Sequence, residues 1–212
     1  MHTRPISLIE HTKKIFTKII TTRIANVICR YPILSKHNHV AIPNTSTALP
    51  ISTLTHIIND AHANKKELWM LSQDMSKAYD TVHILLLIKA LERIKIPKEI
   101  CQLVNNIFAE RHNSVITNHG TTNLYLVHDG IDQGETITPL LWRIYYDPLI
   151  SRVSNQYRGY SLNSSYITQQ KAEKINSSFS VLAFMDDTMW IANSKQEMSN
   201  ILLIASSFFC PY

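Results

Sequence analysis

Apolar residues recur along the chain with two different periods, and each period predicts a different kind of element. Apolar positions three or four residues apart predict amphipathic helices, whereas short apolar runs bounded by turn residues predict strands. The predicted helices cover residues 7–29, 51–63, 82–94, a segment that opens at Pro97, 139–153 and 195–208. The predicted strands cover residues 68–73, 114–117, 123–127 and the apolar runs on both sides of Asp186 and Asp187. Short strands interleaved with helices indicate an α+β domain.

Two polar stretches fit neither period. Residues 31–50 contain several prolines and predict a loop. Within it, His37 and His39 are expected to be solvated rather than to form part of a metal site. Residues 158–178 are also polar, and we expect a poorly ordered insertion there.

Composition narrows the function classes. With 212 residues and 45% hydrophobic residues, the chain can bury an ordinary core as one domain, or as a domain with part of another. A formal net charge of +5 suits a polyanionic partner, although a solvated basic surface is the simpler alternative. Three widely separated cysteines favour a reducing compartment over a disulfide framework. No apolar stretch approaches a membrane span or a signal peptide, so we expect an intracellular protein with no membrane partner.

The candidate chemistry centres on three aspartates. Asp186 and Asp187 separate two apolar, strand-forming runs, so they are expected near the tip of a β-hairpin. Asp74 follows the predicted strand 68–73. Carboxylates that converge at strand ends are the ligands that a divalent-metal site for phosphoryl transfer requires. The alternative is an ordinary polar turn at Asp186 and a helix N-cap at Asp74.

Three segments, in this order, resemble the motifs of the reverse transcriptases of non-LTR (LINE-type) retrotransposons. Residues 74–80 (Asp-Met-Ser-Lys-Ala-Tyr-Asp) resemble their first acidic motif, and residues 130–141, with Gln-Gly at 133 and 134, resemble their Gln-Gly motif. Residues 184–187 (Phe-Met-Asp-Asp) resemble their aromatic-x-Asp-Asp box. Residues 4–8 (Arg-Pro-Ile-Ser-Leu) are similar, less specifically, to their finger motif.

The resemblance implies an RNA-directed DNA polymerase with an RNA template, a DNA primer and dNTPs as partners. It implies a polymerase palm whose Asp74, Asp186 and Asp187 hold two Mg²⁺ ions, with Mn²⁺ as the alternative ion. The expected division is a partial fingers region over residues 1–66 and a palm region over residues 67–212, which together form one reverse transcriptase-like domain without a thumb.

The resemblance also implies residues that contact the nucleotide. Tyr79 stands at the position that senses the sugar, where a ring would collide with a 2′-hydroxyl and so favour dNTPs. Gln133 and Gly134 would allow the backbone to approach the nascent base pair, and Arg4 would contact the triphosphate. The alternatives are a core aromatic, a simple strand-to-helix turn and a surface arginine. Asp80 is expected to cap the helix that follows it.

Two acidic residues depart from the usual Gln-Gly motif. Asp132 replaces the usual proline before the glutamine, and Glu135 replaces the usual serine after the glycine. Both would add negative charge near the nucleotide and template path, and two hypotheses follow: they weaken phosphate binding by like-charge repulsion, or they are tolerated variants of a sublineage. The missing thumb and the abrupt apolar tail favour a second hypothesis, a non-catalytic remnant that at most binds nucleic acid weakly, whereas the intact metal ligands favour the polymerase. An unrelated two-metal phosphotransferase is a third hypothesis, against which Tyr79 and the Gln-Gly turn argue.

Overall fold

The computed structural model describes residues 7–41, 46–168 and 171–209. The chain forms two compact units, each built from two separate stretches of sequence. Unit 1 comprises the described residues up to Ile33 together with Ser76–Tyr145, and unit 2 comprises Leu34–Met75 and the described residues from Tyr146 onward. The expected boundary between fingers and palm at residue 66 does not coincide with any boundary between the two units, and it stays a prediction. In the described part of the chain, no helix combines the length and the apolar character needed to cross a membrane.

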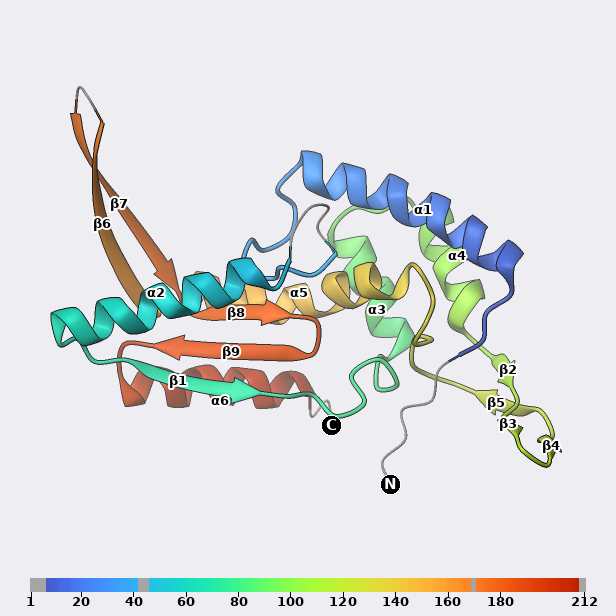
Figure 1. The fold of residues 1–212 in the computed structure, drawn as a ribbon. Helices are drawn as coiled ribbons and strands as arrows, with labels where there is room; N and C mark the ends of the chain where they lie inside the picture. Colours follow the sequence, from blue (N-terminus) through green and yellow to red (C-terminus); the bar gives the residue numbers. More distant parts are fainter. Residues whose placement is uncertain (1–6, 42–45, 169–170, 210–212) are drawn as a thin grey trace. The chain divides into compact units, whose positions relative to one another are not determined.

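Unit 1 is built mainly from helices (Figure 1). These are α1 (His11–Arg30), α3 (Ile84–Arg93), α4 (Lys98–Phe108) and the first turns of α5 (Thr138–Gln156). Helices α3 and α4 pack against each other, and their inward faces are fully buried at Leu87, Leu91, Val104 and Phe108. Helix α4 begins after Pro97 and carries Glu99 in its first turn, which suits both the fixed backbone of proline and the helix dipole.

A segmented hairpin completes unit 1. Strand β2 (Arg111–Asn113) pairs with β5 (Tyr125–Val127), and β3 (Ile116–Thr117) pairs with β4 (Gly120–Thr121). A hairpin was predicted here, but its pairing begins earlier than expected, at Arg111. Gly120 lies in β4 next to the turn rather than within the turn.

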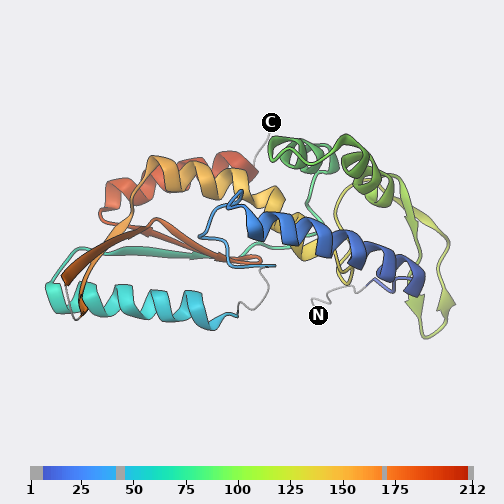
Figure 2. The ribbon, with the colours of Figure 1, turned by 90° about the horizontal axis from the view of Figure 1, so that it is seen from above.

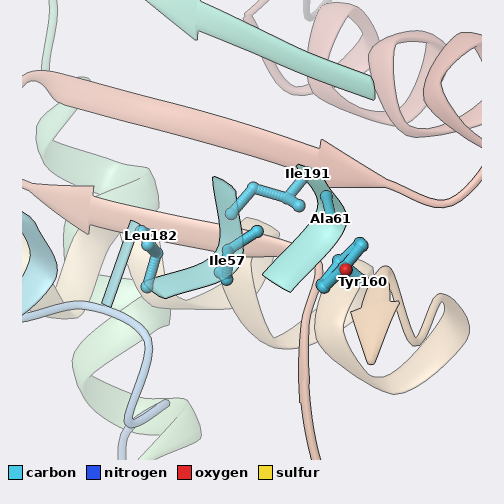
Figure 3. Packing of buried hydrophobic residues seen from close by; sticks show 5 residues of the cluster. All are labelled: Ile57, Ala61, Tyr160, Leu182 and Ile191. Atoms are coloured by element: carbon cyan, nitrogen blue, oxygen red, sulfur yellow. The ribbon is translucent and has the colours of Figure 1, made fainter. Parts of the chain in front are cut away.

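Unit 2 contains a three-stranded antiparallel sheet with helices on both faces (Figures 1 and 2). The strands lie in the order β1 (Trp69–Gln73), β9 (Asp187–Ala192) and β8 (Val181–Phe184). Helix α2 (Ala48–Asn64) covers one face, and α6 (Lys195–Phe209) with the second half of α5 lies on the other. Figure 3 shows the core between α2 and the sheet, where Ile57 and Ala61 meet Leu182, Ile191 and Tyr160.

The stretch around His37 extends this sheet instead of forming a solvated loop. The N–H of His39 donates to the carbonyl of Ala183, and the N–H of Ala183 donates to the carbonyl of His37, each at 2.9 Å. His37 and His39 are 8% and 9% exposed, and Asn38 between them is fully buried. The expectation of solvated histidines was therefore wrong, because backbone pairing along the outer side of β8 draws this stretch inward.

The polar stretch near residue 170 also differs from expectation. Residues Tyr160–Thr168 (β6) and Lys171–Phe179 (β7) form a two-stranded antiparallel ribbon, an element that the sequence pattern did not predict. Nine residue pairs run from Tyr160 opposite Phe179 to Thr168 opposite Lys171. Backbone pairing supports this ribbon where no apolar period marks the sequence.

Candidate active site

The three candidate metal ligands lie at one end of the sheet in unit 2. Strands β1 and β9 are antiparallel with Gln73 opposite Thr188, so Asp74 and Asp187 follow at the same end. Strands β8 and β9 form the predicted hairpin, in which Phe184 pairs with Asp187 and Asp186 lies in the turn between them. Met185, the other turn residue, has a φ of +57°, which permits this tight connection.

Two side-chain hydrogen bonds hold the strand ends that carry these aspartates. The Trp190 indole N–H donates to Gln73 Oε1 at 2.6 Å, which ties β9 to the last residue of β1. On β9, the hydroxyl groups of Thr188 and Tyr146 lie 3.1 Å apart, which ties this strand to α5. Burial raises the pKa of the Tyr146 hydroxyl well above its usual range.

The three carboxylates are accessible and lack partners within the described chain. Asp74 and Asp187 are exposed and Asp186 is half-buried. No described residue forms a hydrogen bond or ion pair with any of the three carboxylate groups. Among the described residues, no three His, Cys, Asp or Glu side chains lie close enough together to hold a metal ion as a set. The backbone therefore gathers the three aspartates at one sheet end without bringing their side chains together.

A cavity of about 210 Å³ opens beside Asp187. It lies between the first turns of α2 and the sheet, and its walls are mostly apolar. The lining includes Pro50, Ile51, Leu182, Phe184 and Met189. Of the three candidate metal ligands, Asp187 borders this cavity, which lies on the face of the sheet that α2 covers.

Tyr79 and the Gln-Gly turn are held together in unit 1. The N–H of Ile131 donates to the carbonyl of Tyr79 at 2.9 Å, and the N–H of Gly130 donates to the carbonyl of Val82 at 2.8 Å. The Tyr79 ring meets the ring of Trp142 edge to face, with centroids 5.8 Å apart. These contacts hold Tyr79, which is half-buried, beside the chain that leads into Gln133 and Gly134.

Gly130 is required by this close approach. Its φ is +87°, and a Cβ atom at this position would lie 2.9 Å from the carbonyl oxygen of Asp80. A side chain would therefore push the two segments apart. Gly134 also has a positive φ, +115°, which favours glycine in the turn itself.

The two acidic departures from the motif are buried and paired, contrary to expectation. Asp132, 6% exposed, accepts a hydrogen bond from Arg111 Nε at 3.1 Å. Glu135, 3% exposed, has Lys13 Nζ 3.3 Å from Oε1 and accepts a hydrogen bond from Thr17 Oγ1 at Oε2, at 3.0 Å. Each negative charge is compensated inside the chain, so neither is free to repel a phosphate.

Other candidate residues have different outcomes. Arg4 lies outside the described residues. Asp80 does not cap the next helix, because α3 begins after His83. The first N–H of this helix, that of Ile84, donates to Asp129 Oδ1 at 3.2 Å. Asp74 is not a helix N-cap either, since it directly follows β1.

Comparison with known proteins identifies the family. Residues 1–210 match the family described as reverse transcriptase (RNA-dependent DNA polymerase). The chain belongs to this reverse transcriptase family. It is 25% identical over 163 residues to a retrovirus-related Pol polyprotein from the type-1 retrotransposable element R2 of Popillia japonica, and 23% identical over 193 residues to that of Nasonia vitripennis. These matches cover 77% and 91% of this chain but only 25% and 17% of the relatives.

Solved structures support the fold of this reverse transcriptase chain. Telomerase from Candida albicans, solved in complex with a fragment of telomeric RNA, matches 93% of the chain with a TM-score of 0.61 and 13% identity. Telomerase from Candida tropicalis, truncated from its C-terminal domain, matches 92% with a TM-score of 0.59 and 16% identity. The chain covers 32% and 37% of these two structures. The predicted α+β polymerase-like fold is therefore confirmed.

The groups that hold the Gln-Gly turn were not predicted from the sequence. Lys13, Thr17 and Arg111 occur in a basic helix and at the start of a polar hairpin, where solvated side chains are the ordinary expectation. One signal was present: an acidic residue at a position that becomes buried requires a cationic partner. Which partner serves depends on the fold, because the cation Arg111 is 21 residues from Asp132 and the hydroxyl donor Thr17 is 118 residues from Glu135.

Proposed function

We propose that this chain is the catalytic region of an RNA-directed DNA polymerase that adds dNTPs to the 3′-hydroxyl of a primer paired with an RNA template. The register of β1 against β9, which brings Asp74 and Asp187 to one sheet end, carries this proposal. Membership of the reverse transcriptase family gives it independent support. The basic net charge of +5 suits the polyanionic template and primer.

Asp74, Asp186 and Asp187 are the residues that would hold Mg²⁺. The fit is one of donor chemistry, since Mg²⁺ prefers carboxylate oxygens and these three carboxylates are accessible and lack partners in the described chain. When bound, the ions would supply positive charge that stabilises the attacking and leaving oxygens of the phosphoryl transfer.

The nucleotide would be selected by residues of unit 1. The Tyr79 ring would exclude a 2′-hydroxyl and so favour dNTPs, while Gln133 and Gly134 would line the nascent base pair. Trp142 supports the Tyr79 ring, and the Ile131 N–H bond holds the Tyr79 backbone, so the selecting ring is braced on two sides.

Primer extension tests the proposal directly. The purified chain is incubated with a primed RNA template, dNTPs and Mg²⁺ beside Asp186→Asn, with circular dichroism on both proteins. Extension by the parent chain alone is the expected result. A folded parent that does not extend the primer would refute the proposal and favour the non-catalytic alternative.

A further inference from the structure

The Gln-Gly turn is bracketed by two buried carboxylates, and each is held by a different part of unit 1. Asp132 precedes the turn and Glu135 follows it, and both side chains are almost inaccessible to solvent. Burying a carboxylate is unfavourable unless a cation and hydrogen bonds compensate its charge. The identity of the compensating groups therefore shows what fixes the turn.

Arg111 is the principal group on the side of Asp132. Its Nε donates to Asp132 Oδ1 at 3.1 Å, while Nη1 donates to the carbonyl oxygens of Phe108 at 2.8 Å and Gly130 at 2.9 Å. Nη2 donates to the carbonyl of Asp129 at 3.4 Å. One planar guanidinium thus joins the end of α4 to three residues of the segment that enters the turn. A lysine has a single ammonium group and cannot reproduce this fan of donors.

The segment that Arg111 holds also holds the Tyr79 loop. Gly130 and Ile131 lie between Asp129 and Asp132, both of which Arg111 contacts. Their N–H groups donate to the carbonyl oxygens of Val82 and Tyr79, respectively. The space between Gly130 and Asp80 has no room for a Cβ atom, so the two backbones pack in direct contact beside these bonds. A displacement of residues 129–132 would therefore reach both Tyr79 and the Gln-Gly turn.

The side of Glu135 is held less tightly. Lys13 and Thr17 of α1 bind its carboxylate, and Ser7 donates its N–H to the carbonyl of Gln133 at 3.0 Å. The Lys13 side chain is 34% exposed, whereas that of Arg111 is 13% exposed. Water can replace part of the Lys13 interaction, so Arg111 contributes more to fixing the turn.

We propose that Arg111 is a positioning residue for nucleotide binding, acting through its ion pair with Asp132 and its bonds to residues 108, 129 and 130. The inference rests on the proposed function, because it assigns Tyr79 and the Gln-Gly turn to the nucleotide. Arg111 itself does not touch the nucleotide. It keeps the turn and the Tyr79 loop in the one arrangement that a dNTP can enter. The nucleotide therefore binds without the loss of conformational entropy that ordering these segments would require.

The test uses Arg111→Lys in the full chain, with Arg152→Lys as the matched control at an exposed arginine. Hydrogen–deuterium exchange is measured for peptides covering residues 129–136 and, as an internal reference, 187–192. We expect Arg111→Lys to speed exchange at residues 129–136 about tenfold and to leave 187–192 unchanged. Exchange within about twofold of the parent at residues 129–136 would overturn the proposal.

Steady-state primer extension then separates positioning from simple loss of folded protein. A turn that occupies its binding-competent arrangement for a smaller fraction of the time raises the apparent dissociation constant in proportion. We expect Arg111→Lys to raise the KM for dNTPs about tenfold, to change kcat less than about threefold, and to lower the preference for dNTPs over NTPs. A fall in kcat with an unchanged KM would indicate a merely structural role and would overturn the proposal.

The two readouts distinguish failure of this inference from failure of the proposed function. If the parent chain does not extend a primer, the proposed polymerase activity fails, and with it the role of Arg111 in nucleotide binding. Exchange at residues 129–136 would still decide whether Arg111 holds the turn. If the parent extends and Arg111→Lys matches Arg152→Lys in KM and exchange, only the assignment of Arg111 fails.

Discussion

Asp132 and Glu135 in unit 1 are buried and each is paired with a cation, whereas Asp74 and Asp187 in unit 2 are exposed at a strand end. The same kind of side chain therefore has two roles in one molecule. The buried carboxylates complete the fold, and their partners are supplied by the chain. The exposed carboxylates have no partner in the described chain, which leaves their oxygens free to bind something that the chain does not supply.

The largest expected effect is on activity at the exposed end of the sheet. Asp186→Asn should abolish primer extension, on the order of a thousandfold or more, because it removes a charge that metal binding requires. The melting temperature should stay within a degree or two of the parent, since Asp186 has no partner in the described chain to lose. Primer extension measures the loss of activity, and thermal denaturation measures the change in melting temperature. Retained extension would contradict the assignment of Asp186.

The same kind of substitution should have the opposite result in unit 1. Asp132→Asn should destabilise the chain by about 3 kcal/mol, because it leaves the Arg111 guanidinium buried without its counter-charge. Asp74→Asn should change stability by less than about 0.5 kcal/mol. Urea denaturation of both variants measures the contrast. Combining Asp132→Asn with Arg111→Gln should cost less than the sum of the single changes, and a simple sum would show that the two residues are not coupled.

Stability should also fall in mild acid because of His37. Burial is the main cause that lowers its pKa from 6.5 to about 4, and the positive charges of Lys36 and His39 add to it. Between these values the folded chain keeps His37 neutral while the unfolded chain takes up a proton. The contribution of neutral His37 to the free energy of unfolding is therefore complete above pH 6.5. It is lost as the pH falls toward 4, by up to about 3 kcal/mol.

His37→Phe keeps a ring against Phe179 and removes the titrating group. Its urea midpoint should depend less on pH between 6.5 and 4 than that of the parent. His119→Phe, at an exposed histidine of the β3–β4 turn, is the control and should leave the pH dependence unchanged. Equal pH dependence in the His37 variant and the parent would contradict the burial argument.

The smallest expected effect concerns sugar selection. Tyr79→Val should lower the preference for dNTPs over NTPs about tenfold, equivalent to about 1.4 kcal/mol, because it removes the ring that excludes a 2′-hydroxyl. Tyr79→Phe retains the ring and its contact with Trp142, so its selectivity should match that of the parent. Single-nucleotide incorporation with dNTPs and NTPs gives the ratio. Unchanged selectivity in Tyr79→Val would remove Tyr79 from the nucleotide site.

Local pattern predicted much of the fold. The strand expected at 68–73 is β1 (Trp69–Gln73), and the helix expected at 139–153 is α5 (Thr138–Gln156). The hairpin at Asp186 and Asp187 was also predicted, since its flanking runs are apolar enough to be buried. These elements share a strong local signal that matches what the tertiary structure requires.

The elements that sequence reasoning missed depend on partners distant along the chain or on backbone pairing. The β6–β7 ribbon has a polar sequence, and its nine residue pairs involve backbone groups that composition does not reveal. His37 and His39 are buried because their backbone pairs with Ala183. The Asp132 and Glu135 pairs are of the same kind: sequence reasoning noticed the unusual charges but could not identify the cations that neutralise them.

The register of β1 against β9 makes this protein sensitive to the length of a strand as well as to its composition. Side chains alternate between the two faces of a sheet, so deleting one residue from β1 would send Asp74 to the face opposite Asp187 if the apolar pattern still paired. The same strand could accept many substitutions, because its side chains are exposed or only half-buried. If the proposed function holds, single-residue insertions and deletions in this short segment should abolish activity more often than changes of residue type.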